Sequence, residues 1–150
     1  MAILEEEIQQ KLFSGPYHKL IVNILYTGSW MSLLNANYLK VFGLTLPQFN
    51  VLRILRGQHP LAASVNLIIE RMLDKSSNAS RIVDKLLGKE LAEKKTCKND
   101  KRAVDVKITI KGLNLLAEID KQKNKLESSF KTLTKTEAVQ LNNLLDKLRG

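Results

Sequence analysis

The stretch DKRAVDVKITIKG, residues 100–112, changes its pattern from polar to alternating and then to helical. From Val104 to Ile108 apolar residues alternate with polar ones, which is typical of a strand that buries one face. Residues 91–96 form a weaker candidate partner strand, and the polar segment 97–102 separates the two. The pattern therefore predicts a β-hairpin with a polar tip.

Helical spacing dominates the chain on both sides of this hairpin. Apolar residues recur every three or four positions, as they do on the buried face of a helix. Gly43 is expected to end one helix, and Thr45, Thr109 and Thr134 are expected to begin three others. The spacing predicts helices over residues 1–13, 17–42, 45–56, 64–72, 76–89, 109–131 and 134–149.

The order of these elements predicts the fold class. Helix, helix, short turn, helix and β-hairpin, in that order, make a winged helix-turn-helix. We expect a mainly α-helical fold with a small β-hairpin, in which residues 1–150 form one domain. Residues 45–111 would be the winged-helix lobe, and residues 1–42 and 112–150 would be dimerisation helices at the two ends of the chain.

Dimerisation is predicted because the terminal helices carry more apolar residues than a monomer would expose. Packing within one chain is the alternative. The residues concerned are Ile3, Leu4, Ile8, Leu12, Leu141, Leu144, Leu145 and Leu148.

Composition restricts the function further. The formal net charge is +9, and the segment 71–111 holds 12 basic and 6 acidic residues, which favours a polyanionic partner such as nucleic acid. The single cysteine excludes an internal disulfide and fits a cytoplasmic protein without a membrane segment. Without a phosphate-binding loop, a Ser-based hydrolase motif or a His/Cys cluster, we expect no enzyme, no cofactor and no metal site.

The predicted helix 76–89 is the candidate element that reads DNA. Its apolar side would pack on the core, and its polar side could donate to bases and phosphates in a major groove. A plain solvated face is the alternative. The candidate DNA contacts are Ser76, Ser77, Asn78, Ser80, Arg81 and Lys85.

Residues 100–112 resemble the DxRxxxVxLTxxG signature of the MarR (multiple antibiotic resistance regulator) family, with Ile108 where the family prefers Leu. Residues 80–86 are similar to its recognition helix, and residues 46–52 to its second helix. One position departs from the family pattern: Glu90 stands where the family usually has glycine. Either the helix-ending glycine has moved to Gly88 or it has been lost.

The resemblance implies a sequence-specific, double-stranded DNA-binding transcriptional regulator, a ligand-responsive repressor that acts as a homodimer on a pseudo-palindromic operator. The alternative is a winged-helix protein-interaction module without sequence-specific DNA binding. In the family the signature Arg, here Arg102, enters the minor groove, and the signature Asp, here Asp100, braces the wing. The basic neighbours Lys98 and Lys101 are expected to contact phosphates.

The resemblance also implies a small aromatic effector. Tyr26, Trp30 and Phe49 are the candidate ligand contacts, although aromatic residues at helical spacing are commonly part of a core. Cys97 is either a surface thiol without a role or an oxidant sensor, because neighbouring lysines lower a thiol pKa.

Overall fold

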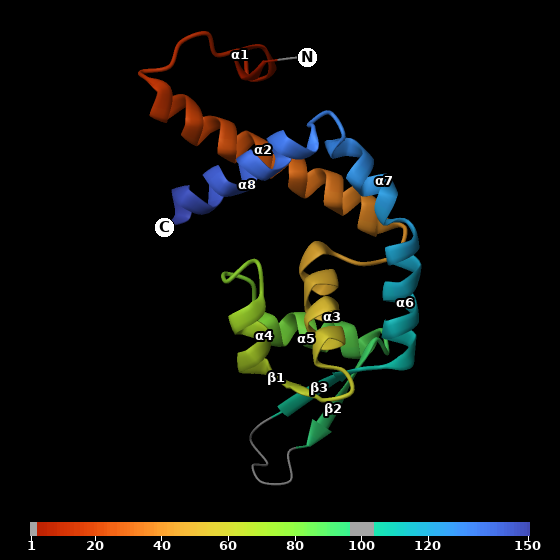
Figure 1. Cartoon of the computed structure of the whole chain (residues 1–150). Helices are drawn as coiled ribbons and strands as arrows, with labels where there is room; N and C mark the ends of the chain where they lie inside the picture. The colour runs from red at the N-terminus through yellow and green to blue at the C-terminus, as the bar shows by residue number, and fades with distance from the viewer. Residues whose placement is uncertain (1–2, 97–103) are drawn as a thin grey trace. The chain divides into compact units, whose positions relative to one another are not determined.

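The structure is a computed structural model that describes residues 3–96 and 104–150. The chain divides into two compact units, residues 1–46 and residues 47–150. Most of the described residues are helical, and one small antiparallel sheet lies in the second unit (Figure 1). The predicted fold class, mainly α-helical with a winged helix-turn-helix, is confirmed.

The first unit contains helices α1 (Leu4–Glu7) and α2 (Pro16–Lys40). The prediction of one helix over residues 1–13 is wrong. Helix α1 is a single turn that ends where Gln9 adopts a left-handed φ of 54°, and Leu12 farther along is 85% exposed. Apolar spacing alone does not extend a helix whose apolar side chains are not buried.

Helix α2 ends as predicted at a glycine. Gly43 has a φ of 65°, a left-handed conformation that favours glycine. The backbone N–H of Gly43 donates to the carbonyl of Lys40 at 3.0 Å, and that of Leu44 donates to the carbonyl of Leu39 at 3.2 Å. These bonds satisfy the last carbonyl groups of the helix.

The second unit contains the winged-helix elements and the C-terminal helices. They are α3 (Leu46–Gln58), β1 (Ala63–Ser64), α4 (Val65–Arg71), α5 (Ala79–Gly88), β2 (Ala92–Thr96), β3 (Val104–Ile108), α6 (Ile110–Lys121), α7 (Lys123–Glu127), the 3-10 helix η1 (Ser128–Phe130) and α8 (Lys135–Arg149). The strands β2 and β3 lie below α3, α4 and α5 in the view of Figure 1.

The sheet has the order β1-β3-β2, with both pairings antiparallel. Both predicted hairpin strands are confirmed. Strand β1 was not predicted, since two residues are too short for an alternating pattern. Its pairing of Ala63 with Val106 ties the segment before α4 to the hairpin.

The core of the second unit lies between the sheet and its helices. Its fully buried large side chains come from α3, α4, α5, β3 and α6: Leu52, Leu55, Ile68, Leu86, Val106 and Leu116. The long predicted helix 109–131 is wrong in its second half, because the chain leaves helical geometry at Gln122 and continues as α7 and η1. The predicted caps Thr109 and Thr134 are confirmed, each accepting a backbone hydrogen bond three residues on.

Membrane spans and metal clusters are both absent from the described ranges. Within residues 3–96 and 104–150, no helix is long and apolar enough to cross a membrane. In the same ranges, no three His, Cys, Asp or Glu side chains come together as metal ligands would.

Candidate nucleic-acid interface

Helix α5 has one buried face and one exposed face. Ala79, Val83 and Leu86 are buried in the core of the second unit, as the apolar spacing predicts. Ser80, Arg81 and Lys85 are exposed. Because they lie on the side opposite the buried residues, the helix is strongly amphipathic. The exposed face is therefore available for a partner.

The helix begins three residues later than predicted, so Ser76, Ser77 and Asn78 do not lie on it. The carboxylate of Asp74 accepts hydrogen bonds from the backbone N–H and hydroxyl of Ser76, at 2.9 and 2.6 Å, and from the hydroxyl of Ser77 at 2.6 Å. Asn78 caps the helix, since its side chain accepts the backbone N–H of Arg81 at 3.0 Å. These side chain–backbone bonds compete with helix formation and hold residues 74–78 in a turn.

Two side chains that sequence reasoning did not single out fix the same turn. The amide oxygen of Asn50 on α3 accepts the backbone N–H of Leu73 at 3.0 Å. The ammonium of Lys75 donates to the carbonyls of Ile69, at 3.1 Å, and Glu70 at the end of α4. An Asp two residues before a Ser is a sequence signal for such a turn, whereas the distant Asn50 has none.

The Asp74 carboxylate stays charged in this turn. Its hydrogen bonds from Ser76 and Ser77 hold the pKa of Asp74 below its usual value. An anionic side chain in the turn that leads to α5 would repel a nearby phosphate group. We infer that Asp74 acts by ordering the turn and not by contacting a nucleic acid.

The junction between α5 and β2 explains the departure at Glu90. Glu90 itself adopts a φ of 59°, whereas Gly88 has no positive φ and is the last residue of the helix. The helix-ending glycine has therefore been lost and not moved. The Glu90 carboxylate accepts a hydrogen bond from the Lys111 ammonium at 2.8 Å, which lowers the pKa of Glu90.

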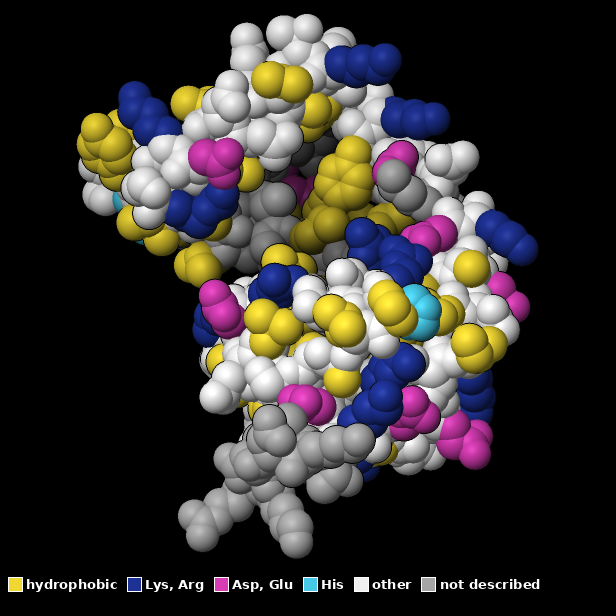
Figure 2. Space-filling view, turned by 60° about the horizontal axis from the view of Figure 1, so that its bottom comes forward, with side chains coloured by type: hydrophobic (Ala, Val, Ile, Leu, Met, Phe, Trp, Pro, Cys, Tyr) yellow, Lys and Arg dark blue, Asp and Glu magenta, His cyan; other side chains and the backbone are white. Residues whose placement is uncertain are grey.

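Two exposed cations of α5 make no ion pair with any residue that the structure describes. Lys94 pairs with Asp84 at 3.3 Å, but Arg81 and Lys85 make no ion pair within the described part of the chain. Lys and Arg side chains, with acidic ones between them, lie on the face of the molecule in Figure 2. Unpaired cations beside the polar face of α5 suit a polyanion.

The predicted wing contacts Lys98, Lys101 and Arg102, the bracing residue Asp100 and the thiol of Cys97 lie outside the described residues. The strands that lead to them are described. Thr96 pairs with Val104 at the last register position of β2 and β3. The roles assigned to the tip remain predictions.

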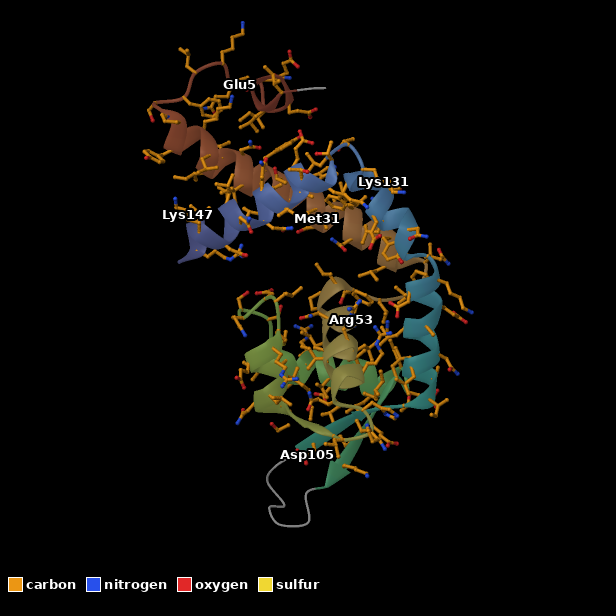
Figure 3. All side chains as sticks on the ribbon, viewed as in Figure 1. Glu5, Met31, Arg53, Asp105, Lys131 and Lys147 are labelled. Atoms are coloured by element: carbon orange, nitrogen blue, oxygen red, sulfur yellow. The ribbon has the colours of Figure 1, made fainter. Side chains whose placement is uncertain are left out.

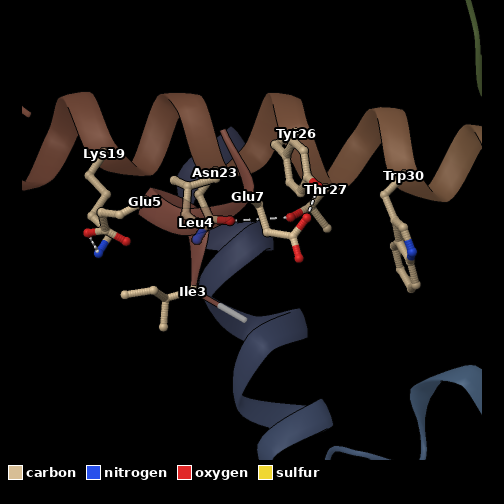
Figure 4. Close-up of a pocket in the computed structure, with 9 residues that line it drawn as sticks. All are labelled: Ile3, Leu4, Glu5, Glu7, Lys19, Asn23, Tyr26, Thr27 and Trp30. Carbon is tan, nitrogen blue, oxygen red and sulfur yellow. Dashed lines mark hydrogen bonds and ion pairs between the residues drawn. The ribbon is translucent and has the colours of Figure 1, made fainter. Parts of the chain in front are cut away.

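Two of the three predicted ligand contacts lie together. Tyr26 and Trp30 line a pocket in the first unit (Figure 4). Phe49 is not among its lining residues. Phe49 lies on α3, where the guanidinium of Arg53 is 5.8 Å from the centre of its ring. Arg53 is labelled in Figure 3.

Comparison with known protein families identifies the winged-helix segment. The MarR family model matches residues 44–104, from the end of α2 to the start of β3. Residues 44–104 form a MarR family domain. This match confirms the family that the sequence resembles, and it spans α3, α4, α5 and the first strand of the wing.

Solved structures extend the similarity beyond the MarR domain. A cysteine-to-serine mutant of MarR from E. coli, complexed with operator DNA, is 25% identical, with a TM-score of 0.77 over 98% of this chain and 99% of that chain. A MarR-like transcription regulator from Bacillus cereus is 22% identical, with a TM-score of 0.78 over 87% of this chain and 94% of that one.

A third solved structure concerns effector control. BpsR of Bordetella bronchiseptica, whose DNA binding is regulated by 6-hydroxynicotinic acid, is 23% identical, with a TM-score of 0.76 over 93% of this chain and 96% of that one. No curated protein matches the chain at a significant level.

Proposed function

We propose that this chain is a cytoplasmic, non-enzymatic transcription regulator that binds double-stranded operator DNA in a sequence-specific way. It acts as a homodimer on a pseudo-palindromic site and represses transcription until a small ligand binds. The fold and the MarR domain support DNA binding and transcription regulation. Repression, the homodimer and the residue roles are our inference.

The observation that carries this proposal is the exposed face of α5. Arg81 and Lys85 are exposed and have no acidic partner in the described ranges, and Ser80 lies on the same side of the helix. An α-helix fits the major groove, where Arg can donate two hydrogen bonds to guanine. The ordered turn at residues 74–78 places Ser76, Ser77 and Asn78 directly before this helix.

The solved neighbours support the same interpretation. The E. coli MarR mutant, similar over nearly the whole chain, was solved with operator DNA. The DNA binding of the B. bronchiseptica protein is regulated by a small aromatic acid. In both comparisons this chain and the solved chain are covered almost completely. The similarity therefore includes the terminal helices as well as the winged helix.

The homodimer is supported by the exposed apolar side chains of the long helices. A monomer rarely leaves so many large apolar side chains in contact with water. On α2 they are Tyr17, Leu20, Ile21, Ile24, Leu25 and Leu33, and on α8 they are Val139, Leu141, Leu144 and Leu148. Sedimentation at micromolar concentration should give about twice 17.0 kDa. A single 17.0 kDa species would contradict the dimer.

DNA binding is tested by titrating salt with purified protein and a duplex. Arg81→Ala should weaken binding at specific base positions by about 1–3 kcal/mol if Arg81 contacts a base, and Lys85→Ala should weaken it on every sequence if Lys85 contacts a phosphate. Lys147→Ala on α8 removes the same charge away from α5 and is the control. If neither Arg81→Ala nor Lys85→Ala weakens binding more than the control does, α5 is not in the interface.

The same titration separates the alternative function. A winged-helix module that binds only proteins would show no preference among duplexes, and its weak binding would disappear at moderate salt. A preference for one sequence that survives the salt titration supports the regulator.

A further inference from the structure

A pocket of about 690 Å³ lies in the first unit, between α1 and the N-terminal half of α2. Its volume is in the range of pockets that hold drug-sized molecules. It is lined by residues 3–5 and Glu7 on one side and by Lys19, Asn23, Tyr26, Thr27 and Trp30 of α2 on the other.

The charges of the lining sum to one negative charge. The carboxylate of Glu5 forms an ion pair with the ammonium of Lys19, and this pairing lowers the pKa of Glu5. Glu7 has no cation beside it in the described ranges. It accepts a hydrogen bond from the Tyr26 hydroxyl at 2.7 Å, which raises the pKa of Tyr26 and keeps the phenol neutral. The uncompensated charge of the pocket is therefore that of Glu7.

One lining oxygen lacks the partner that buried polar atoms require. Oε2 of Glu5 is buried and accepts no hydrogen bond from any described residue, although Oε1 of the same carboxylate is paired with Lys19. A buried acceptor without a donor is costly. Because this oxygen has almost no accessible surface, it is not itself exposed to a ligand in the pocket.

Two aromatic side chains add a surface for a flat ligand. Tyr26 and Trp30 lie one helical turn apart on α2 and are 37% and 43% exposed. In Figure 4 the Glu7 carboxylate lies between the Glu5–Lys19 pair and the ring of Trp30. A cation held over an aromatic ring is attracted by the negative face of that ring.

We propose that this pocket binds an aromatic organic cation that carries N–H donors, such as an aryl amidinium. The negative charge of Glu7 selects the cation and accepts its N–H groups, and the rings of Tyr26 and Trp30 select its flat aromatic part. The preference is opposite to that of the whole chain, whose net charge of +9 favours anions. The proposal deepens the effector part of the proposed function and rests on it only for the regulatory consequence.

Trp30 is the single tryptophan of the chain, so its fluorescence reports on this pocket alone. We would titrate the full-length protein, without DNA, with benzamidinium, benzamide and benzoate, which have nearly the same shape and the charges +1, 0 and −1. Benzamidinium should change the fluorescence with an affinity about ten-fold or more above that of benzoate. Equal affinities, or tighter binding of benzoate, would overturn the proposal.

A pair of variants locates the charge. Glu7→Gln keeps an acceptor for Tyr26 but removes the charge, and it should weaken benzamidinium about ten-fold without weakening benzamide. Glu6→Gln makes the same change next to it, at an exposed residue outside the lining. If the two variants weaken benzamidinium equally, the cation does not bind beside Glu7.

The absence of DNA from these titrations keeps the two proposals distinguishable. If the protein binds benzamidinium but no duplex, the proposed pocket ligand is supported and the proposed function is contradicted. If the protein binds a duplex but binds the three ligands with equal affinity, the proposed function is supported and the proposed pocket ligand is contradicted.

Discussion

Gly112, in the first turn of α6, lies directly against the backbone carbonyl of Leu91 at the start of the wing. A Cβ atom at Gly112 would be 2.4 Å from the Leu91 oxygen and 2.8 Å from the side chain of Ile108. The same carbonyl accepts the backbone N–H of Thr109 at 3.2 Å, so the oxygen cannot move away without losing that bond. The last residue of the family signature is thus a glycine for a steric reason.

Gly112→Ala should therefore destabilise the fold by about 2 kcal/mol, since overpacking against backbone forces the helix off the sheet. Gly57→Ala is the matched control, because Gly57 is helical and a methyl group added there would have no atom within 4 Å. The control should be neutral or stabilise by up to about 1 kcal/mol. Urea unfolding measures both, and equal effects would contradict the packing at Leu91.

The backbone conformation of Glu90 predicts that a glycine at this position would stabilise the fold. Its left-handed backbone disfavours any side chain with a Cβ, whereas glycine adopts that conformation freely. Glu90→Gly should raise the thermal unfolding midpoint by a few degrees, even though the exposed pair with Lys111 is lost. Glu90→Ala loses the same pair and keeps the Cβ, so its midpoint should not rise. A rise in both variants would mean that the pair, and not the backbone, is unfavourable.

Asp74 should help DNA binding in spite of its charge. Asp74→Ala frees the turn that Ser76 and Ser77 close, and ordering it again on binding should lower affinity about five-fold. Asp84→Ala, on α5 itself, removes an equal charge that holds no turn, and it should raise affinity because phosphate repulsion falls. Thermal unfolding of both variants checks the fold. If both raise affinity, Asp74 is only a charge near the DNA.

The expected role of Arg102 in the wing makes the affinity depend on the base composition of the DNA that flanks the operator. If Arg102 enters the minor groove, Arg102→Ala should lose more affinity for A·T-rich flanks than for G·C-rich ones, because the narrow A·T groove is strongly negative. Lys101→Ala and Lys98→Ala should weaken binding on both duplexes and reduce the salt slope by about one unit each. Identical behaviour of Arg102→Ala and Lys101→Ala would leave the wing as an electrostatic clamp.

The sequence predicted elements whose pattern is both regular and buried. Val106 and Ile108 alternate with polar residues because their side of β3 faces the core, and the apolar face of α5 repeats because Val83 and Leu86 are buried. The caps at Thr109 and Thr134 were equally predictable, since a capping side chain acts within three residues of itself.

The features that were missed depend on contacts between distant residues or on competing local bonds. Strand β1 exists only through its pairing with β3, and Asn50 reaches Leu73 across 23 positions. Helix α5 begins later than predicted because the hydroxyls of Ser76 and Ser77 donate hydrogen bonds to the carboxylate of Asp74. The N-terminal helix was too long in the prediction because its apolar spacing continues past residues that are not buried.

Whether the chain reads a DNA sequence through α5 is tested most directly by selection. Purified protein is mixed with random duplexes, bound DNA is recovered and sequenced over several rounds, and Arg81→Ala is carried in parallel. We expect enrichment of a pseudo-palindrome, with half-sites about 10 base pairs apart, and a relaxed preference at one position of each half-site for Arg81→Ala. Recovery of no enriched sequence by the wild-type protein, or of the same sequence with unchanged preference by the variant, would contradict sequence reading through α5.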